Sequence, residues 1–239
     1  GHDLIQLDNV HLTAYPHLFR KLPYDPRTDF ELLLPLFKAS FFFVVATNSS
    51  YKSVGDIIAD AKTKPAKLNY GSWSIGNPVH LASELFGSLT GTQMQHVVYK
   101  ETSQLYSDVA NGELAFALGT YGTTQALYKA GRLRYVAVIG AKRLAAYPDV
   151  PTVRESGGPA ELEALGWTTL AAPRGVPPAV AEKIRRDLEK ILAEPDIAQR
   201  YATFGYEPFP VTKEQFNAHI AGESARFAEV IRKAKISVD

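Results

Sequence analysis

Residues 68–86 hold the groups best suited to binding an anion. The segment reads as a short strand, a polar loop with two serines and two glycines, and the start of a helix. Asn77 is a favourable N-cap and Pro78 suits the first helical turn. The first amides of a helix have no partner within it and lie at the positive end of its dipole, so they can hold a carboxylate or phosphate without Lys or Arg. An ordinary capped turn is the alternative, because small polar residues serve turns as well.

The helix that follows is expected to be fixed by one apolar face. Ala82, Leu85, Phe86 and Leu89 recur at the spacing of a single helical stripe. His80 lies on the first turn, where it could donate to a ligand, although packing or capping is the commoner role. The loop matches neither the Walker pattern nor a full G-x-G-x-x-G, so a nucleotide site is not indicated.

Two further segments repeat the order strand, polar loop, helix. Residues 95–99 are followed by the loop 100–103, and residues 114–118 by the loop 119–124. Alternating strands and helices predict parallel sheets with helices on both faces. Ligands gather at the carboxyl ends of such strands, so we expect the three polar loops to lie at one edge of a sheet.

The two ends of the chain are predicted to form a scaffold around this region. Residues 3–7 read as a strand, and the polar residues 8–11 as a loop that could line a ligand site. Residues 177–192, 195–204 and 212–235 read as amphipathic helices, the last with a capping box at Thr212 and Gln215.

Composition excludes several classes of function. The 239 residues carry a net charge of +1 and no basic run, which argues against nucleic acid or an anionic membrane as partner. The absence of cysteine excludes disulfides and thiolate metal sites. The longest apolar run, residues 41–46, is too short to span a membrane. No nucleophile motif, metal-ligand spacing or carboxylate pair stands out, so we expect neither catalysis nor a cofactor.

Several segments together resemble the solute receptors of tripartite tricarboxylate transporters, also called the Bug family. The similar segments are residues 1–5, 16–26, 29–30, 70–72 with 76–82, 99–100, 129–134 and 148–153 followed by 155–157. The resemblance runs nearly from end to end. It implies an α/β fold of two domains like a type II periplasmic binding protein, each a mainly parallel sheet flanked by helices. The first domain would comprise residues 1–44 and 169–239, and the second residues 45–168.

The family resemblance also implies a ligand site. A cleft between the domains would close on a small organic carboxylate, held by loop amides and hydroxyls rather than by a salt bridge. The matching positions are Ser72, Trp73, Ser74, Gly76 and Asn77 in the second-domain loop, Thr120 and Tyr121 at the next strand end, and Asp8 and Asn9 in the first-domain wall.

The implied function is that of a periplasmic receptor without a chemical step. It would bind a di- or tricarboxylate, an acidic amino acid or an aromatic carboxylate and present it to membrane permease subunits. A sensory protein of the same fold, read by a regulatory partner, is the alternative. An enzyme on a similar scaffold is argued against by the missing nucleophile, base and metal groups.

The chain departs from the family pattern at several positions. Trp73 stands where small residues are usual and would either stack on an aromatic acid or narrow the pocket. Glu101 replaces a common Gly, and Gly119 a common acidic residue. The family's opening strand and Gly-rich loop have no counterpart here, and no signal peptide is present. A protein that started at Gly1 is therefore expected to bind weakly or to need that segment from elsewhere.

Overall fold

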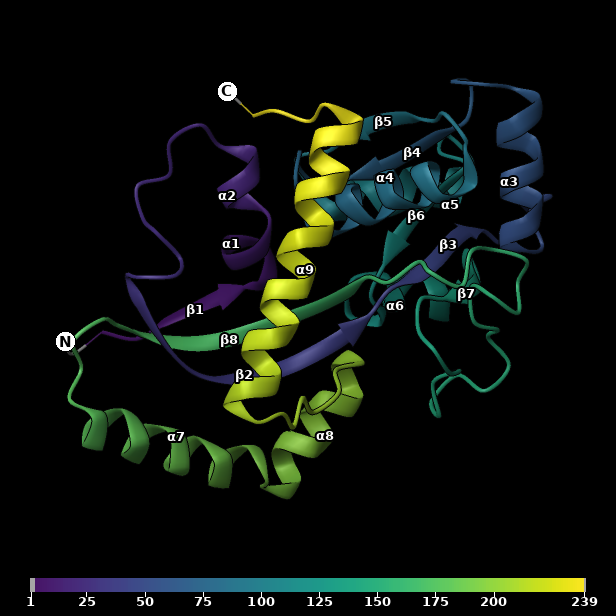
Figure 1. The fold of residues 1–239 in the computed structure, drawn as a ribbon. Helices are drawn as coiled ribbons and strands as arrows, with labels where there is room; N and C mark the ends of the chain where they lie inside the picture. Colours follow the sequence, from purple (N-terminus) through teal and green to yellow (C-terminus); the bar gives the residue numbers. More distant parts are fainter. Residues whose placement is uncertain (1–2, 239) are drawn as a thin grey trace. The chain divides into compact units, whose positions relative to one another are not determined.

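A computed structural model of the protein describes residues 3–238 and divides the chain into two compact units. Unit 1 comprises Gly1–Ala39 and Gly166–Asp239, and unit 2 comprises Ser40–Leu165. The chain therefore leaves unit 1 once, at residues 39–40, and returns to it at residues 165–166. Figure 1 shows the elements of both units in the order of the sequence.

Among the described residues, unit 1 contains a three-stranded sheet with the order β1-β8-β2. The strands are β1 (Ile5–Asp8), β8 (Leu165–Pro173) and β2 (Phe30–Ser40), and β1 runs antiparallel to β8. The helices of the unit are α1 (Asn9–Thr13), α2 (Tyr15–Leu18), α7 (Pro178–Leu192), α8 (Pro195–Phe204) and α9 (Lys213–Ala234).

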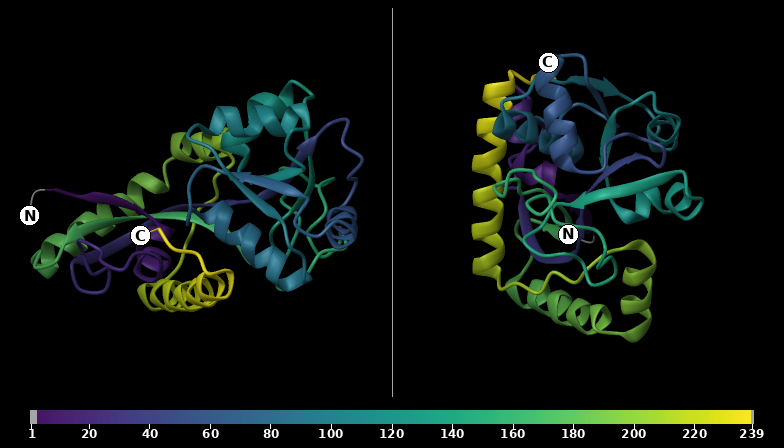
Figure 2. Two further views of the ribbon diagram at one scale, coloured as in Figure 1. Left: turned by 90° about the horizontal axis from the view of Figure 1, so that it is seen from above. Right: turned by 90° about the vertical axis from the view of Figure 1, so that its right-hand side faces the viewer.

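The long helix α9 supplies much of the core of unit 1. Helix α9 crosses the strands of the unit 1 sheet in Figure 1, and Figure 2 shows it on one face of that sheet. Phe216, Phe227, Val230 and Ile231 of this helix are buried, and the Trp167 ring on β8 packs edge-on against Phe216 at 5.0 Å. The expected capping box is confirmed, because Thr212 Oγ1 accepts from Gln215 N and Gln215 Oε1 accepts from Thr212 N.

Unit 2 is a five-stranded sheet with the order β5-β4-β6-β3-β7. Its strands are β3 (Phe42–Ala46), β4 (Asn69–Ser72), β5 (Gln95–Val98), β6 (Phe116–Gly119) and β7 (Leu133–Val138). Its helices are α3 (Val54–Thr63), α4 (Pro78–Thr90), α5 (Thr102–Asn111) and α6 (Tyr121–Lys129).

Both faces of the unit 2 sheet are covered by apolar side chains. Successive residues of β3 alternate between two hydrophobic clusters, with Phe43 in one and Phe42 in the other. Phe86 of α4 joins the first cluster and Leu105 of α5 joins the second. Every residue of β3 is buried, as expected of a strand packed on both faces. Helices α4 and α5 therefore hold this sheet from opposite sides.

The α/β organisation expected from the sequence is confirmed, with sheets that are mixed. Strand β4 is parallel to β5 and β6, whereas β3 is antiparallel to both β6 and β7. Strands that run in the same direction need a crossover connection, and α6 provides it between β6 and β7. Strand β3 lies between these two strands, and the chain enters it directly from β2. One local expectation was wrong. Residues 8–11 were expected to form a loop, but helix α1 begins at Asn9.

Candidate functional site

The sheet of unit 2 has a topological switch point between β4 and β6, where the connections to the next strand go to opposite sides. The chain leaves β4 through α4 to β5 on one side, and leaves β6 through α6 towards β7 on the other. Because β4 and β6 are parallel neighbours, the loop 73–77 and Thr120 follow their carboxyl ends at the same sheet edge. This is the topological position where open α/β sheets bind ligands. The predicted residues other than Asp8 and Asn9 lie in unit 2, at the end of β4, in the loop before α4 and at the start of α6.

Ser72 ends β4 and uses its hydroxyl within the protein. Its side chain is buried, and Oγ donates to the carbonyl of Ser74 at 3.0 Å. Asn77 Nδ2 donates to Ser72 Oγ at 2.9 Å, and His96 Nε2 lies 2.7 Å from the same oxygen. A hydroxyl has one proton and two lone pairs, so these partners fill its capacity. Ser72 therefore shapes the loop and has no free hydrogen-bonding group for a ligand.

Asn77 caps α4, as the sequence predicted. Its Oδ1 accepts from the backbone N–H of Val79 at 2.8 Å and of His80 at 3.0 Å. These helix amides are therefore already paired and cannot bind an anion directly, which corrects the expected use of the helix terminus. No hydrogen bond to the backbone N–H of Trp73, Ser74 or Ile75 occurs within residues 3–238. The anion donors that remain lie in the loop itself.

Gly76 adopts a left-handed backbone conformation with φ of +78°, which favours glycine. Its N–H donates to His80 Nδ1 at 3.0 Å. The His80 side chain is buried and its ring stacks on His96 at 3.9 Å between centroids. Burial and then the neighbouring His96 lower the pKa of His80 to about 3, and burial lowers the pKa of His96 to about 4. Both rings are therefore neutral at pH 7. His80 accepts a hydrogen bond from the backbone of the loop 73–77 and does not face solvent.

The side chains of Trp73 and Tyr121 are partly buried. Trp73 packs against both hydrophobic clusters of unit 2. Tyr121 joins the second cluster, where its ring lies 5.4 Å from that of Tyr147 and Lys129 Nζ lies 5.7 Å from its centroid. Much of both side chains therefore contributes to packing.

Thr120 is the N-cap residue of α6, and its side chain makes no cap bond. Its Oγ1 lies 3.3 Å from Thr123 Oγ1, and its carbonyl accepts from the N–H groups of Thr123 and Thr124. Ser74 is half-buried. The hydroxyls of Ser74 and Thr120 are therefore the side-chain groups of this edge with the most capacity for a ligand.

Asp8 and Asn9 belong to unit 1. Asp8 ends β1 and precedes α1, with its N–H directed at His11 Nδ1 at 3.2 Å. Asn9 is 1% exposed, and its Nδ2 donates to Glu223 Oε1 at 3.3 Å. Burial raises the pKa of Glu223 to about 7, and the Asn9 hydrogen bond opposes that rise. The side chain of Asn9 thus holds α1 to α9.

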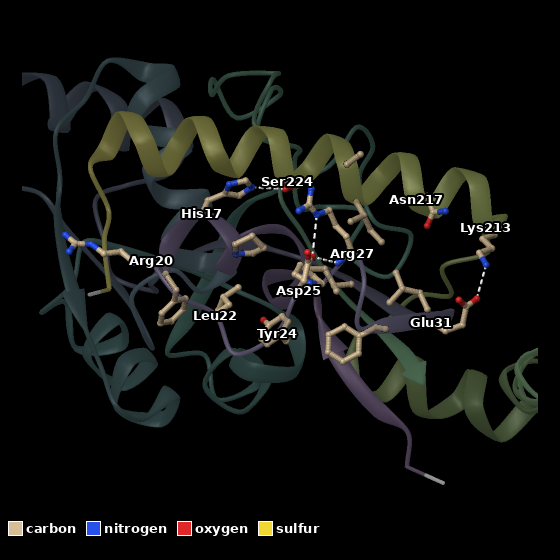
Figure 3. Close-up of a pocket in the computed structure, with 18 residues that line it drawn as sticks. His17, Arg20, Leu22, Tyr24, Asp25, Arg27, Glu31, Lys213, Asn217 and Ser224 are labelled. Carbon is tan, nitrogen blue, oxygen red and sulfur yellow. Dashed lines mark hydrogen bonds and ion pairs between the residues drawn. The ribbon is translucent and has the colours of Figure 1, made fainter. Parts of the chain in front are cut away.

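A cavity of about 810 Å³ lies within unit 1 between α9 and residues 12–32 (Figure 3). No pattern in the sequence indicated this cavity. Its polar groups are largely paired with one another. His17 Nε2 lies 2.8 Å from Ser224 Oγ, and Lys213 Nζ lies 2.9 Å from Glu31 Oε1. None of the predicted site residues lines this cavity.

Residues 3–238 hold neither a metal cluster nor a membrane-spanning helix. No cluster of three or more His, Cys, Asp or Glu side chains suited to a metal occurs there. No helix in the same residues combines the length and apolar character needed to cross a membrane.

Comparison with known proteins gave concordant results. The profile of the tripartite tricarboxylate transporter family receptor matches residues 1–236. Similar curated proteins include one encoded in the gbd 5′ region of Cupriavidus necator, 30% identical over 212 residues, and BugT of Bordetella pertussis, 29% identical over 192 residues. The alignments cover 88% and 80% of this chain but 63% and 59% of those proteins, so the chain spans about three fifths of their length.

A solved structure from the same comparison resembles the whole described fold. Rpa4515 of R. palustris, determined with adipate, superposes with a TM-score of 0.88 at 28% sequence identity. The superposition covers 100% of this chain and 80% of that chain.

Proposed function

Because the chain belongs to the tripartite tricarboxylate transporter receptor family, we propose that it binds a small organic carboxylate in the periplasm and delivers it to the permease of such a transporter. The family match confirms the predicted family and fold class. It also confirms the prediction of a receptor rather than an enzyme. The ligand, the permease and the periplasmic location of this chain are parts of the proposal.

One observation carries the proposal: the family profile extends over residues 1–236. The adipate in the Rpa4515 structure supports a dicarboxylate as the ligand class. The unpaired N–H groups of Trp73, Ser74 and Ile75 provide donors suited to a carboxylate oxygen. Hydrogen bonds to a charged group are each worth about 1.5–3 kcal/mol, so a few such donors can bind the ligand without a salt bridge.

The proposed roles of the site residues differ. Ligand contact is assigned to the amides of the loop 73–75 and to the hydroxyls of Ser74 and Thr120. Ser72, Gly76 and Asn77 fix the shape of that loop, and Trp73 and Tyr121 support it by packing. In unit 1, Asp8 is proposed to line the site, and Asn9 to hold the first turn of α1 through Glu223. The cleft between the two domains stays a prediction.

Titration calorimetry tests the proposal directly. Adipate, malate, citrate, glutamate and benzoate are each titrated into the protein, with adipamide as the uncharged counterpart of adipate. We expect saturable binding of at least one acid and no binding of adipamide. Ser74→Ala and Thr120→Val each remove one hydroxyl, and each should weaken binding by about tenfold if the hydroxyl contacts a carboxylate oxygen.

Two matched controls keep these variants interpretable. Ser88→Ala near the C-terminus of α4 and Thr203→Val on α8 remove exposed hydroxyls away from this sheet edge, and both should leave the affinity unchanged. If Ser74→Ala and Thr120→Val bound the best acid like the controls, the assigned contacts would be wrong. If adipamide bound as tightly as adipate, recognition of the carboxylate would be refuted.

A further inference from the structure

A network of buried and partly buried polar side chains bonds to the loop 73–77 and to the end of β4. His80 comes from α4 and His96 from β5, and their rings stack at 3.9 Å with an angle of 14° between planes. Tyr70 of β4 stacks on His96 at 5.1 Å, and its hydroxyl donates to Glu84 Oε1 at 2.5 Å. The titratable groups facing the histidine pair are therefore Tyr70 on β4, Glu84 on α4, and each histidine for the other.

The hydrogen bonds of the network assign a proton to each ring. Gly76 N–H donates to His80 Nδ1, so that nitrogen is unprotonated and the ring proton lies on Nε2, which is 3.9 Å from Glu84 Oε1. Ser72 Oγ has one proton, which the carbonyl of Ser74 accepts. In that arrangement His96 Nε2–H donates to Ser72 Oγ at 2.7 Å. Each histidine thus makes one specific bond to the loop, at opposite ends of it.

The two bonds act on the backbone that carries the unpaired amides. His96 fixes Ser72, which precedes Trp73, and His80 fixes Gly76, which follows Ile75. Asn77 adds bonds from its side chain to Ser72 Oγ and to the carbonyl of Ser74. The side chains of Ser72 and Asn77 and the carbonyl of Ser74 are therefore paired within the protein. The N–H groups of residues 73–75 keep their capacity for a ligand.

We propose that His80 and His96 are positioning residues for carboxylate binding, which hold the loop 73–77 with its amides unpaired and act as neutral imidazoles. The inference rests on the proposed function of this loop. A proton on His80 Nδ1 would displace the Gly76 N–H, and a charge on either ring would lie next to the other ring. Burial lowers the pKa of both groups to about 3 and 4, so the arrangement persists at neutral pH.

The first test needs no ligand. Nitrogen-15 NMR of the imidazoles at pH 7 should show both rings neutral, with the proton of His80 on Nε2. The Gly76 amide should exchange slowly with solvent, because it is bonded to His80 Nδ1. A charged ring, the other His80 tautomer, or rapid exchange of the Gly76 amide would overturn the inference, whether or not any acid binds.

The second test uses adipate as the probe and paired substitutions. His80→Asn keeps an acceptor near Nδ1 and His96→Gln keeps a donor near Nε2, whereas His80→Phe and His96→Phe keep an aromatic ring without the bond. We expect both Phe variants to weaken adipate binding at least tenfold and the Gly76 amide of His80→Phe to exchange faster. The Asn and Gln variants should stay within about threefold of the parent protein.

The outcomes separate the positioning role from the proposed function. If folded Phe variants bound adipate like the parent, or if the conservative variants lost as much affinity as the Phe variants, the positioning role would be refuted. If the parent protein bound no acid while the NMR results held, the proposed function would fail and the description of the loop would stand.

Discussion

Glu223 makes the stability of unit 1 depend on pH. Its carboxyl is 3% exposed, Oε1 accepts from Asn9, and Oε2 has no hydrogen-bond partner within residues 3–238. Burial raises its pKa from 4.5 to about 7. Between these values the folded protein keeps the proton that the unfolded chain releases, so stability is full below pH 4.5 and falls as the pH rises towards 7. At about 1.4 kcal/mol per pH unit, the total loss is about 3 kcal/mol.

The substitution Glu223→Gln isolates this effect, because the amide keeps the shape and stays neutral. Between pH 5.5 and pH 8 the parent protein should lose about 2 kcal/mol of unfolding free energy relative to the variant. Glu229→Gln on the same helix is the control. Glu229 is exposed and its pKa is lowered by Lys233, so it stays ionised over this range.

Urea denaturation followed by tryptophan fluorescence measures the difference. The chain has two tryptophans, so a Trp73→Phe background leaves Trp167 of unit 1 as the reporter. This choice matters because two units need not unfold in one step. A constant difference between the parent protein and Glu223→Gln from pH 5.5 to pH 8 would refute this pH dependence. So would a difference between the parent protein and Glu229→Gln that changed by the same amount over this range.

Three further predictions concern unit 2 and are checked by urea denaturation of the chain with both tryptophans, followed by far-ultraviolet circular dichroism. Gly119→Ala should lower the free energy of unfolding by about 1–3 kcal/mol, because a Cβ there would lie 2.7 Å from Tyr106 Oη. Gly140→Ala is the control, because its Cβ would meet its nearest atom at 3.5 Å and should change the stability little. Equal effects of the two substitutions would contradict this prediction. Asn77→Ala should lose about 1–2 kcal/mol through the cap of α4, with most of it retained in Asn77→Ser; an unchanged Asn77→Ala would be inconsistent with the cap. Trp73→Ala should lose about 2–3 kcal/mol through packing against both clusters, and no loss would mean that the indole does not support the core.

Local signals in the sequence predicted the elements that depend on neighbouring residues. The cap at Asn77 and the capping box at Thr212 both involve partners within four residues. Such features need no knowledge of the tertiary fold, and they were confirmed.

The sequence failed where partners are distant along the chain. Helix α1 was expected to be a loop, but Asn9 is held by Glu223, 214 residues away. The pairing of β4 with β5 and the packing of α4 bring His80 and His96 together, and neither residue formed part of the predicted site. The antiparallel placement of β3 likewise depends on which strands become neighbours. Hydrophobic periodicity reports which face of an element is buried but not which element covers it.

We propose that this chain recognises a small organic carboxylate through the charge of the ligand. Titration of adipate into the protein at neutral pH, with adipamide in parallel, tests it most directly. We expect saturable binding of adipate, or of another acid of the panel, together with no binding of the uncharged amide. A folded protein that bound none of the acids at millimolar concentration, or that bound adipamide equally well, would contradict it.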